Sequence, residues 1–227
     1  MSKRIYLFCA AAVLAALGVY YYMNRHMGSV RKLEIAKKEV RQLAAKEQIR
    51  EGDIIFQTSQ SSQSKAIQLA THSKYSHCGI IFKDSAGFYV LEAVQPVKHT
   101  ALDKWIAKGL DGRYVIKRLK NASQELNNDV IANMTIVGYL FTGSSYDTYF
   151  GWSDDKMYCS ELVWKIYQRG AGLEVGKLQK LKDFDLTSEP VKRKMKERYG
   201  NHIPLNETVI SPVSIFDSEL LETVTEN

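Results

Sequence analysis

Cysteine and proline are both scarce in this chain of 227 residues, which has 3 cysteines and 4 prolines. Three cysteines neither imply a disulfide framework nor exclude a disulfide. Internal repeats and low-complexity linkers are also missing. The composition, 45% hydrophobic and 25% charged, is that of a globular protein and excludes long disorder, collagen and a multi-span membrane protein. We therefore expect one domain with an appendage.

Excess positive charge is absent from the body of the chain. The whole chain has a formal charge of +6. Residues 1–28 contribute +3, residues 29–50 contribute +4, and residues 51–227 contribute −1. Because the body is neutral, the pI near 9.0 is no evidence for a nucleic-acid groove, and we expect no nucleic-acid partner.

The N-terminus carries a long apolar run. Residues 5–23 are 19 residues without a charge, and at about 1.5 Å per residue they match a hydrocarbon core of about 30 Å. They predict a transmembrane helix, so we expect residues 1–28 to form a single-pass membrane anchor with the membrane as a partner. A signal peptide is the alternative. Basic residues on both sides of the run leave the side of the membrane open.

Residues 29–50 predict a basic juxtamembrane helix. Its apolar residues recur at helical spacing between lysines and arginines. Such a helix could lie against anionic headgroups or form a stalk. Packing against the domain, with its charged face in solvent, is an equally good interpretation.

Residues 51–227 predict an α+β domain with a small antiparallel sheet and packed helices. Apolar and alternating runs predict strands, helical periodicity predicts helices, and Thr100 is expected to cap one of these helices. The closing segment 177–227 is expected to be mostly irregular. The expected strands are 54–56, 76–82, 88–94 and 113–119, and the expected helices are 61–71, 100–108, 125–141 and 157–169.

The two cysteines of the body occupy different settings. Cys78 lies in a strand, on the face opposite to its neighbour His77, and is expected to be a core residue. Cys159 lies at or near the first turn of a helix, where unpaired N–H groups and the helix dipole favour a thiolate. Cys159 is therefore the candidate nucleophile.

A thiolate nucleophile needs an imidazole that moves its proton. Of the five histidines, only His77 stands in an apolar strand, where a base is held rigidly. The base in turn needs an acceptor. If the hairpin loop has two residues (84 and 85) or four (83–86), paired residue numbers sum to 169 and His77 faces Glu92 directly. A loop of odd length puts Glu92 opposite Cys78 instead. Gly79, on the face of His77, is expected to leave room for a helix N-terminus.

Other chemistries are weaker. A zinc site would need His72, His77, Cys78 and Cys159 to converge from opposite strand faces, and no Cys-x-x-Cys pair is present. The acidic pairs at 154–155 and 183/185 are interpreted as helix caps rather than metal ligands. No Gly-rich phosphate loop and no Gly-x-Ser-x-Gly elbow occurs. We expect no metal and no cofactor.

Four segments together resemble a known family. They are GDIIF at 52–56, YSHCGI at 75–80, LEA at 91–93 and YCSELV at 158–163. In this order they resemble the NlpC-type papain-like cysteine peptidase superfamily. The cysteine segment comes last instead of first, so the chain resembles the circularly permuted YiiX/YebB-like branch, which is related to lecithin retinol acyltransferase. The resemblance covers about residues 51–216.

The resemblance implies a permuted papain-like catalytic domain over 51–227 that needs no metal or organic cofactor. It implies that Cys159 is the nucleophile, His77 the general base and Glu92 the orienting residue of a thiol hydrolase. The enzyme would cleave an amide or ester bond through an acyl-enzyme, with the Cys159 N–H helping to stabilise the oxyanion. Cys78 departs from the apolar residue expected there, and a small buried thiol suits that place.

The substrate class stays open at this point. The superfamily implies cell-wall peptide amides, and the permuted relatives imply lipid acyl groups. Tyr146 and Tyr158 are candidate substrate-binding residues of an apolar or peptide cleft, with packing between helix and sheet as the alternative. A lipid acyltransferase and a non-catalytic, membrane-tethered binding module of the same fold remain alternative functions. The oligomeric state is not predicted.

Overall fold

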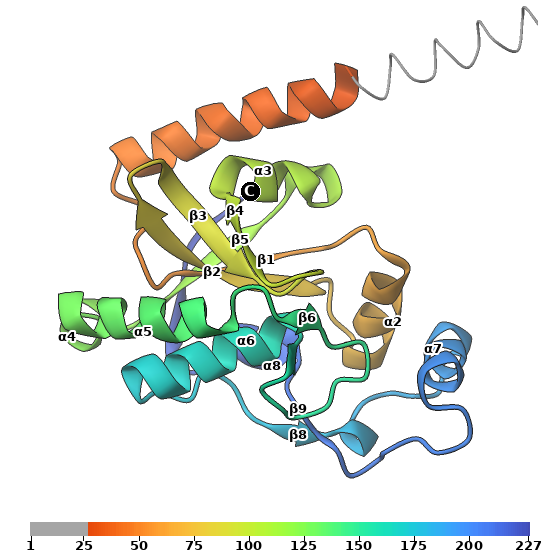
Figure 1. Cartoon of the computed structure of the whole chain (residues 1–227). Helices are drawn as coiled ribbons and strands as arrows, with labels where there is room; N and C mark the ends of the chain where they lie inside the picture. The colour runs from red at the N-terminus through yellow and green to blue at the C-terminus, as the bar shows by residue number, and fades with distance from the viewer. Residues whose placement is uncertain (1–26) are drawn as a thin grey trace, which may run out of the picture.

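The structure, a computed structural model, describes residues 27–227, and its centre is a six-stranded sheet (Figure 1). Neighbouring strands are antiparallel, in the order β10-β5-β1-β2-β3-β4. The predicted α+β class with an antiparallel sheet is therefore confirmed. The strands are β1 (Ile54–Gln57), β2 (His77–Asp84), β3 (Gly87–Glu92), β4 (Lys98–Ala101), β5 (Val115–Leu119) and β10 (Leu221–Glu226).

Helices cover both faces of this sheet, and two short strand pairs lie outside it. The helices are α2 (Ser62–Thr71), α3 (Leu102–Lys108), α4 (Ala122–Glu125), α5 (Asn128–Phe141), α6 (Cys159–Ile166), α7 (Glu189–Tyr199) and α8 (Pro212–Phe216). A π-helical turn, Tyr167–Ala171, extends α6, and 3₁₀ turns occupy Leu110–Gly112 and Leu181–Asp183. The short pairs are β6 (Ser145–Tyr146) with β7 (Lys156–Met157), parallel, and β8 (Gln179–Lys180) with β9 (Thr208–Val209), antiparallel.

The sheet is buried on both faces, which explains the continuous apolar runs in its central strands. In β1, Ile54 and Phe56 face the core shared with α5 and α6, while Ile55 faces the core on the other side. This alternation follows from the two-residue period of a strand. Figure 1 shows α5 and α6 on one side of the sheet, and α3 with the N-terminal helix on the other.

The N-terminal helix packs on the domain. It covers residues 27–45 and buries Ala36 and Leu43 in the core beside α3. Its lysines and arginines alternate with these apolar positions, so one stripe meets the domain and the rest meets solvent. Of the interpretations left open for this segment, packing against the domain is therefore the one that the structure supports.

The predicted transmembrane helix needs a correction. The apolar run 5–23 lies outside the described residues. Within 27–227, no helix combines the length and the apolar character that crossing a membrane requires. The fold class with a preceding transmembrane helix and the single-pass membrane localisation were therefore wrong as predictions. Apolarity of a run alone does not establish a spanning helix, and the helix that is described carries charges along its length.

Two further predictions were wrong. Thr100 does not cap a helix, because it lies in β4 and its hydroxyl group is used elsewhere. The closing segment 177–227 is not mostly irregular, since it contains α7, α8 and three strands. Among these strands, β10 pairs with β5 at the edge of the main sheet and has mostly polar residues. An edge strand needs few apolar side chains, so its pattern is weak.

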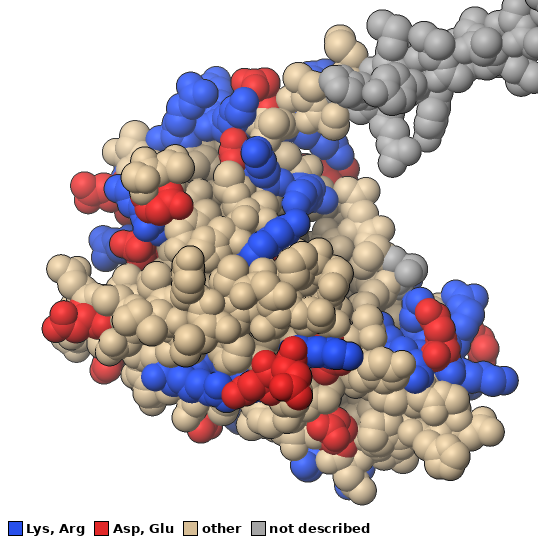
Figure 2. Space-filling model, in the orientation of Figure 1, with Lys and Arg blue, Asp and Glu red and all other residues tan. Residues whose placement is uncertain are grey.

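Positive charge gathers at two places on the face shown in Figure 2. Lysines and arginines cluster over α7 and over the N-terminal helix, and both clusters also contain acidic residues. Between them the visible face is mostly uncharged. No continuous basic groove crosses this face.

Candidate active site

Cys159 is the first residue of α6, as the sequence predicts. Tyr158 precedes it in an extended conformation and caps the helix, and the Glu161 carboxylate accepts a hydrogen bond from the Tyr158 N–H at 3.4 Å. The thiol therefore stands at the positive end of the helix dipole, which favours its thiolate form. Cys159 is only 3% exposed.

The hairpin of β2 and β3 brings His77 and Glu92 together, with a register that differs from the predicted one. The turn consists of residues 85 and 86, so paired residue numbers sum to 171 rather than 169. Continuing this register places Glu92 opposite Gly79, and His77 is its diagonal neighbour on the same face. The two side chains still meet, because His77 Nε2 lies 2.6 Å from Glu92 Oε2. Because the loop has an even number of residues, as predicted, His77 and Glu92 lie on the same face of the sheet despite the different register.

Glu92 has two further partners. The Thr100 hydroxyl donates to Oε1 at 2.6 Å and the Trp105 indole N–H donates to Oε2 at 2.9 Å. Burial alone would raise the pKa of Glu92, but the hydrogen bonds from His77 and Thr100 hold it below its ordinary value. Sequence reasoning missed both partners. The available signal was Trp105, since a tryptophan buried in a core needs an acceptor for its N–H.

Cys78 belongs to the site as well as to the core. It is fully buried in the core cluster that also contains Cys159, and its thiol lowers the pKa of Cys159. The expected burial of Cys78 is confirmed, and its contact with Cys159 was missed. Gly79 does not make room for α6, because a Cβ atom there would lie 2.4 Å from Val90 Cγ1 and 2.7 Å from the Leu91 carbonyl. That glycine permits close packing of β2 against β3.

The protonation of this cluster favours an ion pair. The hydrogen bond from Cys78 and the hydrogen bond from His77 hold the pKa of the Cys159 thiol well below its usual range, although burial opposes them. Burial would lower the pKa of His77, but hydrogen bonds to Cys159 and Glu92 raise it to about 10. Since Nε2 is bound to Glu92, Nδ1 is the ring nitrogen left for the sulfur.

The two candidate substrate-binding tyrosines have different settings. The Tyr146 hydroxyl accepts a hydrogen bond from Gln63 Nε2 at 2.7 Å, in the hollow beside His77. Tyr158 is buried, and its hydroxyl accepts from the Ile210 N–H at 3.0 Å. Its ring packs edge-on against Phe150. Tyr158 is thus held by packing and also lines the pocket between α2 and α7, while Tyr146 lines the hollow beside His77.

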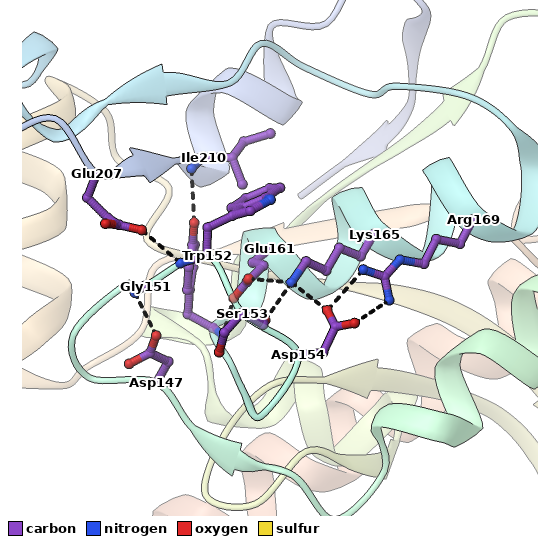
Figure 3. Close-up of polar contacts among 11 residues, drawn as sticks. Asp147, Gly151, Trp152, Ser153, Asp154, Glu161, Lys165, Arg169, Glu207 and Ile210 are labelled. Atoms are coloured by element: carbon purple, nitrogen blue, oxygen red, sulfur yellow. Dashed lines mark hydrogen bonds and ion pairs between the residues drawn. The ribbon is translucent and has the colours of Figure 1, made fainter.

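A network of charges fastens the loop before α6 to that helix (Figure 3). The buried Lys165 ammonium contacts Glu161 Oε1 at 2.7 Å and Asp154 Oδ1 at 2.9 Å. Arg169 also binds Asp154 with two bonds of 2.9 Å. Asp154 is therefore an ion-pair partner and not the expected helix cap. Burial raises the pKa of Glu161 to about 7, against the opposing effect of Lys165.

The zinc alternative finds no support. His72 ends α2 and lies 3.2 Å from Asp185, so it does not join His77. Across residues 27–227, no three His, Cys, Asp or Glu side chains are grouped so that they could hold a metal ion. No step below is therefore derived through a metal.

Two hollows lie beside the candidate catalytic residues. An apolar pocket of about 80 Å³ lies between α2 and α7 and is lined by Cys159. A second hollow, of about 260 Å³ and with polar and apolar residues in its lining, is lined by His77 and Glu92. Gln63 and Ile67 of α2 line both. The cysteine and the histidine thus line different hollows, an apolar one and one of mixed polarity.

The fold and these residues match a known class, the permuted papain-like amidases. The model of the C92 family, described as permuted papain-like amidase enzymes YaeF/YiiX, matches residues 48–225. The chain belongs to this family. The predicted resemblance to the YiiX-like branch is confirmed, as is the prediction of a cysteine amidase or peptidase-type hydrolase.

Two similar proteins extend this finding. The chain is 54% identical over 173 residues to the protein YiiX of Escherichia coli (strain K12), covering 76% of this chain and 84% of that protein. A crystal structure described as the metalloprotein YiiX of Escherichia coli O157:H7 has a TM-score of 0.76 and 50% identity, over 79% of this chain and 98% of that one.

Proposed function

We propose that this amidase cleaves an amide or ester bond through a triad of Cys159, His77 and Glu92. Residues 51–227 would form the catalytic domain. Two observations support the proposal: the imidazole lies 2.6 Å from the carboxylate, and Cys159 and His77 shift each other's pKa toward the thiolate and the imidazolium. Nucleophile, base and orienting group in this order define triad chemistry.

The mechanism follows from the protonation of the cluster. The Cys159 thiolate attacks the carbonyl carbon, and the N–H of Cys159 at the start of α6 donates to the oxyanion. His77, whose pKa is raised to about 10, holds a proton at neutral pH and gives it to the leaving nitrogen or oxygen. Water then attacks the thioester, and His77 accepts its proton. Glu92 keeps the ring oriented through both steps.

The proposed substrates are cell-wall peptide amides or lipid-linked acyl compounds. Either class presents a carbonyl group that a thiolate attacks.

An active-site thiol probe tests the proposal. We expect iodoacetamide to alkylate Cys159 at pH 6 much faster than it alkylates the same thiol in denatured protein, because the thiolate is already formed. His77→Ala should abolish this advantage. Labelling of Cys159 at the denatured rate, unchanged by His77→Ala, would refute the triad. Cys159→Ala identifies labelling at other cysteines.

A further inference from the structure

We propose that Cys78 and Cys159 form a redox-active pair, in which a peroxide oxidises the Cys159 sulfur and Cys78 captures it in a reversible disulfide. Cys159 is then a modification site as well as a nucleophile, and Cys78 is the thiol that resolves the modified form. The inference goes beyond the proposed function and shares with it only the thiolate of Cys159.

Cys78 lies on the face of β2 that packs against α6. It pairs in register with Phe56, and both residues belong to the core cluster that also contains Leu162 and Cys159 of α6. The thiol and the backbone of Cys78 both lower the pKa of Cys159, and these effects require direct contact. Both cysteines are free thiols. The nucleophile therefore has a second thiol as a neighbour inside the protein.

The two thiols differ in protonation and in access. The pKa of Cys159 is held well below its usual range, whereas burial and, after it, the effect of Cys159 raise the pKa of Cys78 well above its usual value. Cys159 borders the pocket between α2 and α7 and is 3% exposed, while Cys78 is 0% exposed. Susceptibility to oxidation follows thiolate character and exposure. Oxidation by a small peroxide therefore starts at Cys159.

The reaction balances with hydrogen peroxide as its one co-reactant. The Cys159 thiolate attacks a peroxide oxygen, so an S–O bond forms and the O–O bond breaks. The departing hydroxide takes the proton of His77 and becomes water, which leaves Cys159 as a sulfenic acid. The Cys78 sulfur then attacks the Cys159 sulfur, an S–S bond forms, and the hydroxyl group leaves as water with the Cys78 proton. The two thiols together lose the two electrons that the peroxide gains.

The disulfide protects the nucleophile while it blocks it. A sulfenic acid without a resolving thiol is oxidised further to a sulfinic and then a sulfonic acid, which thiols do not reduce. A disulfide, by contrast, is returned to two thiols by thiol–disulfide exchange. While Cys159 is held in the disulfide it has no thiolate to attack an amide, so peroxide switches the amidase off and a reductant restores it. A valine at position 78 would fill similar space and give no such protection.

Peroxide treatment of the full chain carrying Cys9→Ala tests the pair, because Cys78 and Cys159 are then its only cysteines. Hydrogen peroxide should lower the intact mass by two hydrogen atoms. Digestion without reductant should yield the two peptides joined through Cys78 and Cys159, identified by mass spectrometry. Dithiothreitol should then restore the fast iodoacetamide labelling of Cys159. None of these measurements needs a substrate.

Variants in the same Cys9→Ala chain isolate the role of the second thiol. Cys78→Val is compared at an equal loss of free Cys159, with labelling normalised to each protein's own rate before treatment. Dithiothreitol should restore labelling when Cys78 is present, whereas Cys78→Val should lose it permanently and gain the mass of two or three oxygen atoms. Ile80→Val, an equally buried change two residues along on the same face, keeps both thiols and should recover fully. If Cys78→Val does not fold, the peptide mapping decides.

The outcomes separate this inference from the proposed function. Fast iodoacetamide labelling, combined with oxidation of Cys159 to the sulfinic acid and no joined peptides, would overturn the pair and leave the thiol hydrolase intact. Full recovery of Cys78→Val would overturn it as well. Labelling of Cys159 at the denatured rate before any peroxide is added would instead refute the proposed function, because the thiolate itself would be missing.

Discussion

Replacing Glu92 with glutamine removes the charge beside His77 and keeps the shape of the site. The amide carbonyl can accept from His77 and Trp105, which both donate to Oε2 in the native protein. The amide NH₂ can then donate to the Thr100 hydroxyl, which is able to act as an acceptor. No partner is left unsatisfied, so the substitution isolates the electrostatic effect of the carboxylate on the imidazole.

The expected magnitude follows from the hydrogen bond that changes. A bond to a charged group contributes about 1.5–3 kcal/mol and a neutral one about 0.5–1.5 kcal/mol, so the imidazolium loses roughly 1–1.5 kcal/mol. One pKa unit corresponds to about 1.4 kcal/mol. We therefore expect the pKa of His77, about 10 in the native protein, to fall by about one unit in Glu92→Gln.

NMR titration of the His77 ring measures this shift directly. His77→Asn assigns the signal among the five histidines. Glu125→Gln, at an exposed site on α4, is the matched control and should leave the midpoint of His77 unchanged. A midpoint in Glu92→Gln equal to the native value, with the fold intact, would refute the role given to the carboxylate.

The same shift predicts how stability depends on pH. In the folded protein His77 holds its proton up to about pH 10, while the unfolded imidazole releases it near 6.5, so this contribution is lost as the pH rises through 10. The lowered pKa of Cys159 acts in the opposite sense and favours folding above the ordinary thiol value of 9.0. Above pH 6.5 the two contributions cancel up to nearly pH 9, as long as Cys159 is a thiolate in the folded protein. From pH 9 to 10 the loss from His77 exceeds the remaining gain from Cys159, so stability should fall by about 0.7 kcal/mol, and Glu92→Gln should largely abolish that fall.

Three further substitutions test separate parts of the structure. Cys78→Val removes the thiol that lowers the pKa of Cys159, so that pKa should rise and iodoacetamide alkylation at pH 6 should slow about fivefold. An unchanged rate would contradict this effect of Cys78. Asp53→Ala leaves the Arg118 guanidinium without its bidentate partner at 2.7 and 2.8 Å, and should lower the free energy of unfolding in urea by about 3 kcal/mol. A decrease below about 1 kcal/mol would argue against a stabilising role of this ion pair. Gly79→Ala places a Cβ 2.4 Å from a β3 side chain and should lower the free energy of unfolding by about 1–3 kcal/mol, as measured by thermal unfolding. Unchanged stability would show that β2 and β3 can separate at no cost.

The sequence predicts the short-range part of the candidate site well. Cys159 at a helix start and His77 in an apolar strand follow from local patterns, and both elements are present. The shared face of His77 and Glu92 depends only on whether the hairpin loop is even or odd, so it survived a register error of two. A register error of two residues leaves each side chain on the same face, because the side chains of a strand alternate between faces.

Long-range packing is what the sequence does not reveal. Trp105 and Thr100 reach Glu92 from other segments, and although a buried tryptophan needs an acceptor, no local pattern identifies Glu92 as that acceptor. Cys78 meets Cys159 only because α6 packs on its face of β2. The strand β10 has a polar pattern and is recognisable only through its pairing with β5. The transmembrane prediction was wrong for the opposite reason. It took a strong local signal, the apolar run 5–23, as sufficient to define the fold class and the localisation.

The order of segments along the chain is independent of the geometry of the site. The hairpin supplies His77 and Glu92, while Cys159 comes from a helix more than sixty residues later that packs on the same sheet. Only this packing, between α6 and β2, joins the sulfur to the imidazole. Loosening of that contact should therefore raise the pKa of the thiol before the hairpin itself is lost. Thiol reactivity is thus a sensitive measure of whether helix and sheet are docked, and it should fall at lower urea concentrations than the loss of β-sheet signal.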